Sequence, residues 1–197
     1  MNAELLAAFA TFAFVSSVTP GPNNLMLLAS GANFGLVRTI PHMLGIGIGF
    51  TVMIVLVGVG LMQVFDAVPA SYTILKIVSV AYLLWLAFKI ANAGAPQGGE
   101  TQGTPMTFLQ AAAFQWVNPK AWTMVLTAIT IYAPDRSLSA IVLVALVFGV
   151  INLPTVSTWT LIGQQMQRLL TDARRLRAFN WTMAALLVAS LWPVLAG

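Results

Sequence analysis

The stretch Thr19-Pro20-Gly21-Pro22-Asn23-Asn24 constrains the fold most, because it interrupts a segment that is otherwise apolar. Residues 5–18 carry only hydroxyl groups as polar side chains, and residues 25–29 are wholly apolar. The two prolines lack backbone N–H groups, and together with the glycine they cannot continue an ordinary helix. The break therefore leaves backbone carbonyl groups without a hydrogen-bond donor. In a membrane, such unpaired carbonyls persist only where protein buries them or where they line a wet cavity. The break is therefore a candidate functional site.

Composition identifies the chain as an integral membrane protein. It has 197 residues, of which 59% are hydrophobic and 7% are charged, with a mean hydropathy of +0.88, whereas soluble domains carry about 25% charged residues. A helix that spans a membrane needs about 20 apolar residues. Suitable apolar runs lie near residues 4–30, 40–65, 70–92, 106–132, 138–162 and 178–196. We therefore expect an all-α protein with six transmembrane helices.

The positions of the charged residues predict how the chain is oriented. Arg38 lies in the first predicted loop, Lys89 just before the third, and four arginines between residues 168 and 177 in the fifth. Because cytoplasmic loops are enriched in Lys and Arg, the odd-numbered loops should be cytoplasmic and both termini should face outward. The pI near 10.0 reflects nine Lys and Arg scattered over the loops of an apolar protein, and membrane topology with contact to lipid explains them better than a nucleic-acid partner.

The two halves of the chain show related patterns. Residues 94–105 form the only linker-like stretch, rich in Gly, Pro and polar residues, and we expect a cytoplasmic linker between residues 1–93 and 106–197. Three spans in each half would insert the halves with opposite orientations, as in many secondary transporters. Pro119 lies 97 residues after Pro22, in a second polar break. The sequence thus predicts two inverted three-helix repeats, with the first and fourth spans broken by proline motifs; two unrelated kinks are the alternative.

Both breaks are expected to begin a new half-helix. In Asn118-Pro119-Lys120, Asn is a preferred N-cap and Pro suits the first helical position, and Gly21-Pro22-Asn23-Asn24 permits the same interpretation. Two helix N-termini would then present amide donors and partial positive charge near the middle of the bilayer, which favours binding of a carboxylate. In the alternative interpretation, the asparagines only satisfy backbone groups that the prolines leave unpaired.

Three further polar residues lie in predicted spans. Lys120 is the only charged residue deep in a span, where it could pair with a substrate carboxylate or exchange protons; extension toward the membrane surface is the alternative. Asn152, close to Pro154 in the fifth span, is expected either to face the breaks or to hydrogen-bond within its own helix. His42, the only histidine, is expected to be an interface residue rather than a proton relay.

Several kinds of chemistry lack the residues they need. The chain has no cysteine, which excludes disulfides, thiolate catalysis and thiolate metal sites. The single histidine has no partner at metal-ligand spacing. All five carboxylates lie in or beside loops, so proton coupling would depend on Lys120, His42 or Asp66. Gly45 and Gly49 form a GxxxG pair, which predicts close helix packing rather than dinucleotide binding. We expect no cofactor, no metal and no enzyme active site.

The motif Pro20-Gly21-Pro22-Asn23, the stretch Asn118-Pro119-Lys120 and the six predicted spans together resemble the LysE/RhtB family of bacterial amino-acid exporters. The resemblance covers the whole chain in layout. It implies export of amino acids or close derivatives across the bacterial inner membrane, driven by the proton gradient, and it implies that these motif positions form the functional site. Many family members have an acid where Asn23 stands, so the asparagine shifts our expectation toward neutral substrates.

We therefore expect a secondary transporter that exports neutral or small polar amino acids by alternating access. The two half-helix N-termini and Lys120 would hold the substrate carboxylate, and Asn23, Asn24 and Asn152 would hydrogen-bond its polar groups. The alternative, from a different class of function, is a passive channel for small polar solutes. The sequence leaves the oligomeric state open, with a homodimer as one arrangement.

Overall fold

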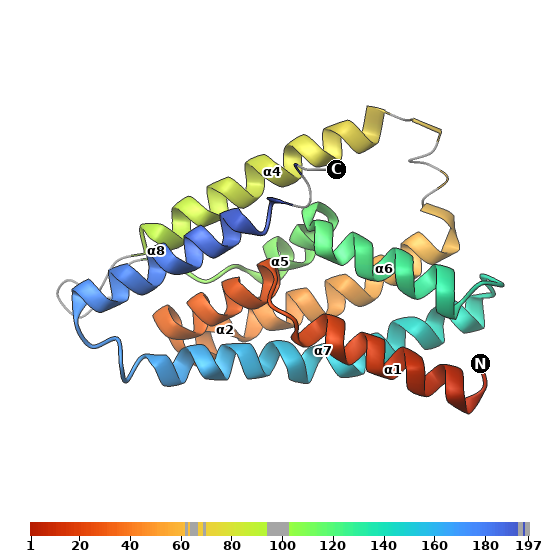
Figure 1. Cartoon of the computed structure of the whole chain (residues 1–197), viewed down its shortest axis with the longest axis horizontal. Coiled ribbons are helices and arrows are strands. Elements are labelled where there is room, and N and C mark those ends of the chain that lie inside the picture. The colour runs from red at the N-terminus through yellow and green to blue at the C-terminus, as the bar shows by residue number, and fades with distance from the viewer. Residues whose placement is uncertain (62, 64–66, 69, 94–102, 193–194, 196–197) are drawn as a thin grey trace.

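The computed structural model of the chain describes residues 1–61, 63, 67–68, 70–93, 103–192 and 195. Within these ranges every regular element is a helix, so the predicted all-α fold is confirmed (Figure 1). The elements are α1 (Ala3–Val18), α2 (Pro22–Leu56), η1 (Val57–Leu61), α4 (Ala70–Ala91), α5 (Phe108–Phe114), η2 (Gln115–Val117), α6 (Pro119–Tyr132), α7 (Leu138–Met166) and α8 (Ala173–Ala189). Asp66 and residues 94–102 of the predicted linker lie outside the described residues.

Helix α2 consists of two limbs, because the chain reverses at Gly35. This glycine has a φ of 78° and a ψ of 173°, a conformation that residues with a Cβ atom rarely adopt. The hydroxyl oxygens of Ser30 and Thr39 lie 2.9 Å apart, whereas a continuous helix would separate them by about 13 Å. The limbs, residues 22–34 and 36–56, therefore pack side by side. They belong to two different predicted spans, and the turn between those spans lies at Gly35.

The two proline motifs interrupt the helices where the sequence predicts. Helix α1 ends at Val18 and α2 begins at Pro22, while η2 ends at Val117 and α6 begins at Pro119. In both cases a proline occupies the first helical position, where its missing N–H would have no partner in the helix. Figure 1 shows α1 and the first limb of α2 on either side of the first break, and α6 extending from the second break along the long axis of the molecule.

Glycines allow the helix backbones to approach closely. Helices α2 and α7 form the most extensive contact in the bundle, and a Cβ atom at Gly163 of α7 would lie 2.2 Å from the backbone oxygen of Leu28. Gly45 and Gly49 lie against the backbone of α5, where a Cβ atom at Gly45 would lie 2.4 Å from the backbone oxygen of Phe108. The close packing predicted from the GxxxG pair is thus confirmed.

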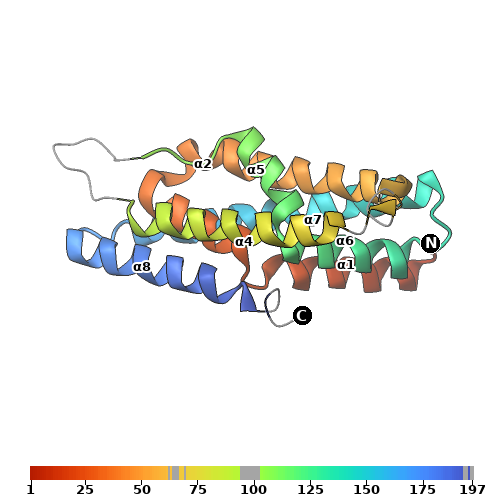
Figure 2. The same cartoon turned by 90° about the horizontal axis from the view of Figure 1, so that it is seen from above.

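The helices of the two halves of the sequence make corresponding contacts. Helix α1 packs against α7, and α5, which follows the linker, packs against α2. Helices α2 and α7 contact each other, as do α4 and α8, which lie side by side in Figure 2. Three described stretches are long and apolar enough to cross a membrane: Pro22–Leu61, which contains the reversal at Gly35, Ala70–Ala91 and Leu138–Met166. These stretches agree with a multi-pass membrane protein.

The fifth predicted loop is shorter than the sequence suggested. We expected Arg174, Arg175 and Arg177 in this loop, but α8 already begins at Ala173. The helix starts early because the Asp172 carboxylate accepts a hydrogen bond from the backbone N–H of Arg174 at 2.9 Å, which caps its first turn. The three arginines therefore lie on the first two turns of α8.

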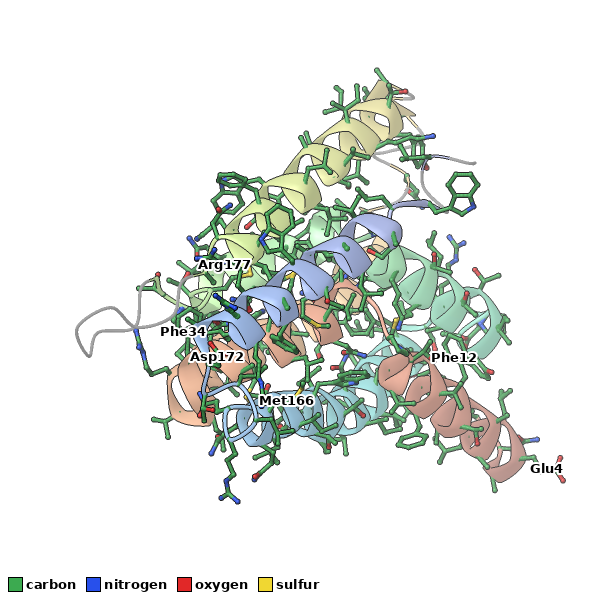
Figure 3. All side chains as sticks on the ribbon, turned by 60° about the vertical axis from the view of Figure 1, so that its left-hand side comes forward. Glu4, Phe12, Phe34, Met166, Asp172 and Arg177 are labelled. Carbon is green, nitrogen blue, oxygen red and sulfur yellow. The ribbon has the colours of Figure 1, made fainter. Side chains whose placement is uncertain are left out.

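The two ends of the bundle differ in charge. Figure 3 shows Glu4 at one end and Arg177 at the opposite end, on the same side as Phe34 near the tip of α2. The last turn of α4, which carries Lys89, reaches this second end as well (Figure 1). We refer to it as the arginine-rich end, and the positive-inside rule predicts that it is cytoplasmic.

Candidate functional site at the two helix breaks

The two helix breaks meet at one small cavity, which we call the break cavity. The predicted site residues that line it are Gly21, Asn23, Asn24, Asn118, Lys120 and Asn152. Its volume of about 20 Å³ leaves room for about one water molecule. The three prolines of the predicted site are not among the described residues that line it. Pro22 and Pro119 begin the half-helices, and Pro20 is exposed within the first break.

Lys120 reaches from α6 across to the first break. Its Nζ donates a hydrogen bond to the backbone oxygen of Thr19, the residue that follows α1. The lysine side chain lies over Gly21, where a Cβ atom would be 2.6 Å from Lys120 Cδ. The Thr19 oxygen also accepts a hydrogen bond from Asn24 Nδ2 at 2.9 Å. An anion could therefore draw the ammonium away without leaving that carbonyl unpaired.

Two of the three asparagines at the breaks hold the backbone in place. Asn24 Nδ2 bridges the first break, since it donates to the backbone oxygen of Ser17 at 2.8 Å as well as to that of Thr19. Asn118 Oδ1 accepts from the backbone N–H of Lys120 at 3.2 Å and caps α6. These bonds pair backbone groups that the helix ends would otherwise leave free. A substrate role for the same asparagines stays a prediction.

Asn23 pairs with Gln115, which the sequence analysis did not single out. Asn23 Nδ2 donates to Gln115 Oε1 at 2.8 Å, and Gln115 Nε2 donates to Asn23 Oδ1 at 3.2 Å and to the backbone oxygen of Ala111 at 2.9 Å. Gln115 is completely buried. The available signal in the sequence was an amide side chain among apolar residues, three positions before the second break. This amide pair ties the two breaks together.

Two polar atoms of residues that line the break cavity have no hydrogen-bond partner in the described part of the chain: Ser17 Oγ and Asn152 Oδ1. Both side chains are buried, and an unpaired buried polar group costs about 1 to 3 kcal/mol unless a ligand or water satisfies it. The cavity thus combines a cation and two helix N-termini with an unpaired carbonyl acceptor. This combination suits a zwitterion, whose carboxylate and ammonium need opposite partners. Ser17 was missed, although it is a hydroxyl two residues before the first motif.

The polar residues of α7 differ in whether they line the break cavity. Asn152 lines the break cavity. Thr155 and Ser157 instead donate to the backbone oxygens one turn earlier in α7, at 2.9 Å and 2.7 Å. Of these three residues, therefore, only Asn152 contributes to the cavity.

His42 contradicts our expectation of an interface residue, since only 1% of its surface is exposed. The reversal at Gly35 folds the second limb of α2 onto the first, and the neighbouring residues Met43 and Ile46 pack with Leu27 in one buried cluster. Sequence position alone placed His42 near the start of a span, whereas packing of the hairpin covers it. It is not one of the residues that line the break cavity.

Known proteins resemble this chain along most of its length. The chain is 32% identical over 192 residues to the cysteine/O-acetylserine efflux proteins of Escherichia coli (strain K12) and Shigella sonnei (strain Ss046), covering 95% of this chain and 96% of each relative. No solved structure matches. The profile of the LysE type translocators matches residues 14–190. Such proteins are transporters and not enzymes, and this chain belongs to the LysE type translocator family.

Proposed function

We propose that this protein is a secondary transporter that exports small neutral or polar amino acids, or close derivatives, across the bacterial inner membrane. The observation that carries the proposal is the break cavity, where Lys120 and two half-helix N-termini lie beside the unpaired oxygen of Asn152. The relatives are named for efflux of cysteine and O-acetylserine, which are small neutral amino acids. Their names support the same class of substrate for this chain.

The substrate would be held by groups of opposite character. Its carboxylate would replace the Thr19 carbonyl as the partner of Lys120 and would lie near the N-termini of α2 and α6. Its ammonium would donate to Asn152 Oδ1, which has no partner among the residues that the structure describes. Asn23 supplies an uncharged amide, so the side chain of the substrate meets no fixed negative charge at this position. These contacts favour a neutral amino acid over lysine or arginine.

Alternating access would follow from movement of the two halves, residues 1–93 and 106–197, about the breaks. The corresponding contacts of α1 with α7 and of α5 with α2 support an inverted repeat of three spans in each half. The break cavity is too small for an amino acid in this conformation. Substrate would therefore bind only after the Asn23–Gln115 pair separates. The inverted arrangement would place both breaks near the middle of the bilayer.

Two features favour a carrier over the passive channel. A channel needs a continuous wet path, whereas the breaks enclose space for about one water molecule. The partly buried Asn23–Gln115 pair closes the gap between the two broken helices. We further propose that protons move inward in exchange for the amino acid, with Lys120 as the ionisable group at the break cavity.

The test is counterflow of labelled amino acids into proteoliposomes loaded with the same unlabelled amino acid. We expect saturable exchange of L-cysteine, O-acetyl-L-serine or L-serine, weak exchange of L-lysine, and faster net export when an imposed pH gradient drives protons in the opposite direction. A channel cannot accumulate label against its gradient by counterflow. Exchange of none of these amino acids would contradict the proposal, and rates unaffected by pH gradients would contradict the coupling.

Replacing Gly21 with alanine is expected to reduce exchange about tenfold with little effect on stability. The new methyl group would lie 2.6 Å from Lys120 Cδ and would push the flexible lysine side chain off the first break. The backbone at Gly21 is extended, with a φ of −168°, so alanine fits the chain without strain. Counterflow and thermal unfolding would be measured together. Gly47→Ala, where the nearest atom is 3.5 Å away, is the matched control; equal exchange in both variants would contradict the predicted role of Gly21.

A further inference from the structure

A second and much larger cavity lies at the arginine-rich end of the bundle. Its volume is about 360 Å³, within the range of small-molecule binding pockets. The first limb of α2 forms one wall with Met26, Ala29 and Ser30. The end of α4 and the segment around Thr104 form the rim, which is exposed. We call this space the vestibule.

The vestibule adjoins the break cavity along α2. Met26 lines the vestibule and Asn23 lines the break cavity, and three residues correspond to about one helical turn. The Asn23–Gln115 pair lies at this boundary. Asn23 lines the break cavity, and Gln115 directly follows Phe114, whose side chain packs in the same cluster as Met26 of the vestibule wall. A solute in the vestibule would thus need this amide pair to open before it reached the breaks.

His42 is the unsatisfied group in the wall of the vestibule. It is 1% exposed, and among the described residues neither ring nitrogen has a hydrogen-bond partner. A neutral imidazole has one N–H donor and one nitrogen acceptor. Leaving both unpaired in a buried position is costly, so a ligand or water that hydrogen-bonds to either nitrogen would be stabilised there.

Two other polar side chains of the wall, Asn33 and Ser30, already use most of their hydrogen-bonding groups within the protein, so His42 is the side chain that can discriminate between ligands. Asn33 uses its amide hydrogens on the backbone oxygen of Ala29 and on Asn180, and its own oxygen accepts from Asn180. Ser30 lies 2.9 Å from the Thr39 hydroxyl, which itself donates to the backbone oxygen of Gly35. Ser30 therefore donates to Thr39 and offers only an acceptor to the vestibule.

We propose that the vestibule is a loading site for small neutral amino acids, and that His42 selects those whose side chain can hydrogen-bond to one of its ring nitrogens, such as a hydroxyl. The inference rests on the proposed transport function and adds a residue that determines specificity. The Lys89 ammonium on the rim lies 4.8 Å from the centre of the Trp85 ring and would turn from that ring to attract the substrate carboxylate. Ser30 accepts from the substrate ammonium, and His42 pairs with the hydroxyl group.

The first test compares L-serine with L-alanine, which differ only by the hydroxyl group. We expect His42→Leu to raise the half-saturating concentration of L-serine in counterflow about threefold to tenfold, the range for one lost hydrogen bond, and to leave that of L-alanine nearly unchanged. His42→Gln keeps a donor and an acceptor and should restore most of the preference for L-serine. Equal changes for both amino acids would assign His42 a structural role and overturn the inference.

Two outcomes separate this inference from the transport proposal. If wild type exchanges no neutral amino acid, the transport proposal fails. If wild type exchanges both L-serine and L-alanine but shows no preference, or if His42→Leu keeps the preference, only the inference about His42 fails. Thermal unfolding of each variant identifies any that do not fold, and the second test below does not depend on His42 variants.

The second test uses the absence of cysteine from the chain. Ala29 and Ala32 lie on the same limb of α2 and are 3% and 4% exposed, but only Ala29 lines the vestibule. We expect a small thiol reagent to modify Ala29→Cys, L-serine to slow that reaction at least about threefold, and Ala32→Cys to react slowly with or without L-serine. A lipid chain that filled the vestibule would block Ala29→Cys regardless of L-serine. That result, or modification without protection, would overturn the loading site.

Discussion

Replacing Lys120 with methionine is expected to reduce amino-acid exchange at least about 30-fold while the protein still folds. Removing one partner of a buried charged pair costs about 2 kcal/mol or more, which corresponds to that factor. Methionine keeps the length of the side chain but cannot bind a carboxylate. Folding should persist because Thr19, whose backbone oxygen accepts from Lys120, also accepts from Asn24 at 2.9 Å. Counterflow in proteoliposomes measures the loss, and thermal unfolding in detergent measures stability.

Two variants make the Lys120 result specific. Lys120→Arg keeps the positive charge and should retain more exchange than Lys120→Met, although the guanidinium is larger and planar. Lys76→Met removes an exposed lysine of α4 that does not line the break cavity, and it should exchange normally. If Lys120→Met exchanges as fast as wild type, Lys120 only pairs with the backbone, and the proposed substrate site is wrong.

Replacing Gly163 with alanine is expected to lower the free energy of unfolding by about 1 to 3 kcal/mol, the range for overpacking a tight contact. Its new methyl group would lie 2.2 Å from the backbone oxygen of Leu28, and a backbone oxygen cannot rotate away as a side chain can. Gly31 approaches the backbone oxygen of Thr160 equally closely on the facing helix. Helices α2 and α7 would have to separate, and they form the largest contact in the bundle.

Gly47→Ala is the matched control for this prediction. It also introduces one methyl group into a helical glycine of α2, but the nearest atom is a side-chain carbon of Leu153 at 3.5 Å, an ordinary contact. We expect its stability to equal that of wild type or to rise slightly, since alanine favours helix. Unfolding of Gly163→Ala at the same temperature as Gly47→Ala would show that the α2–α7 contact does not depend on backbone approach.

The sequence predicted the secondary structure at the breaks because that structure depends on local backbone chemistry. A proline lacks an N–H and fits only the first turn of a helix, so Pro22 and Pro119 determine where the half-helices begin. Asn118 was identified as an N-cap for the same local reason, and the structure confirms its bond to the Lys120 backbone. The apolar composition was sufficient to predict a multi-pass helical membrane protein.

The tertiary structure decided which side chains meet, because those contacts join residues far apart in the chain. Asn23 and Gln115 are 92 residues apart, and no local pattern pairs them. His42 lay near the start of a span by sequence, yet the reversal at Gly35 buries it and makes it part of the vestibule wall. Local dihedral preferences therefore determine the two breaks from sequence alone. Long-range packing of α2 determines the size of the cavities and the polar atoms that stay unpaired in them.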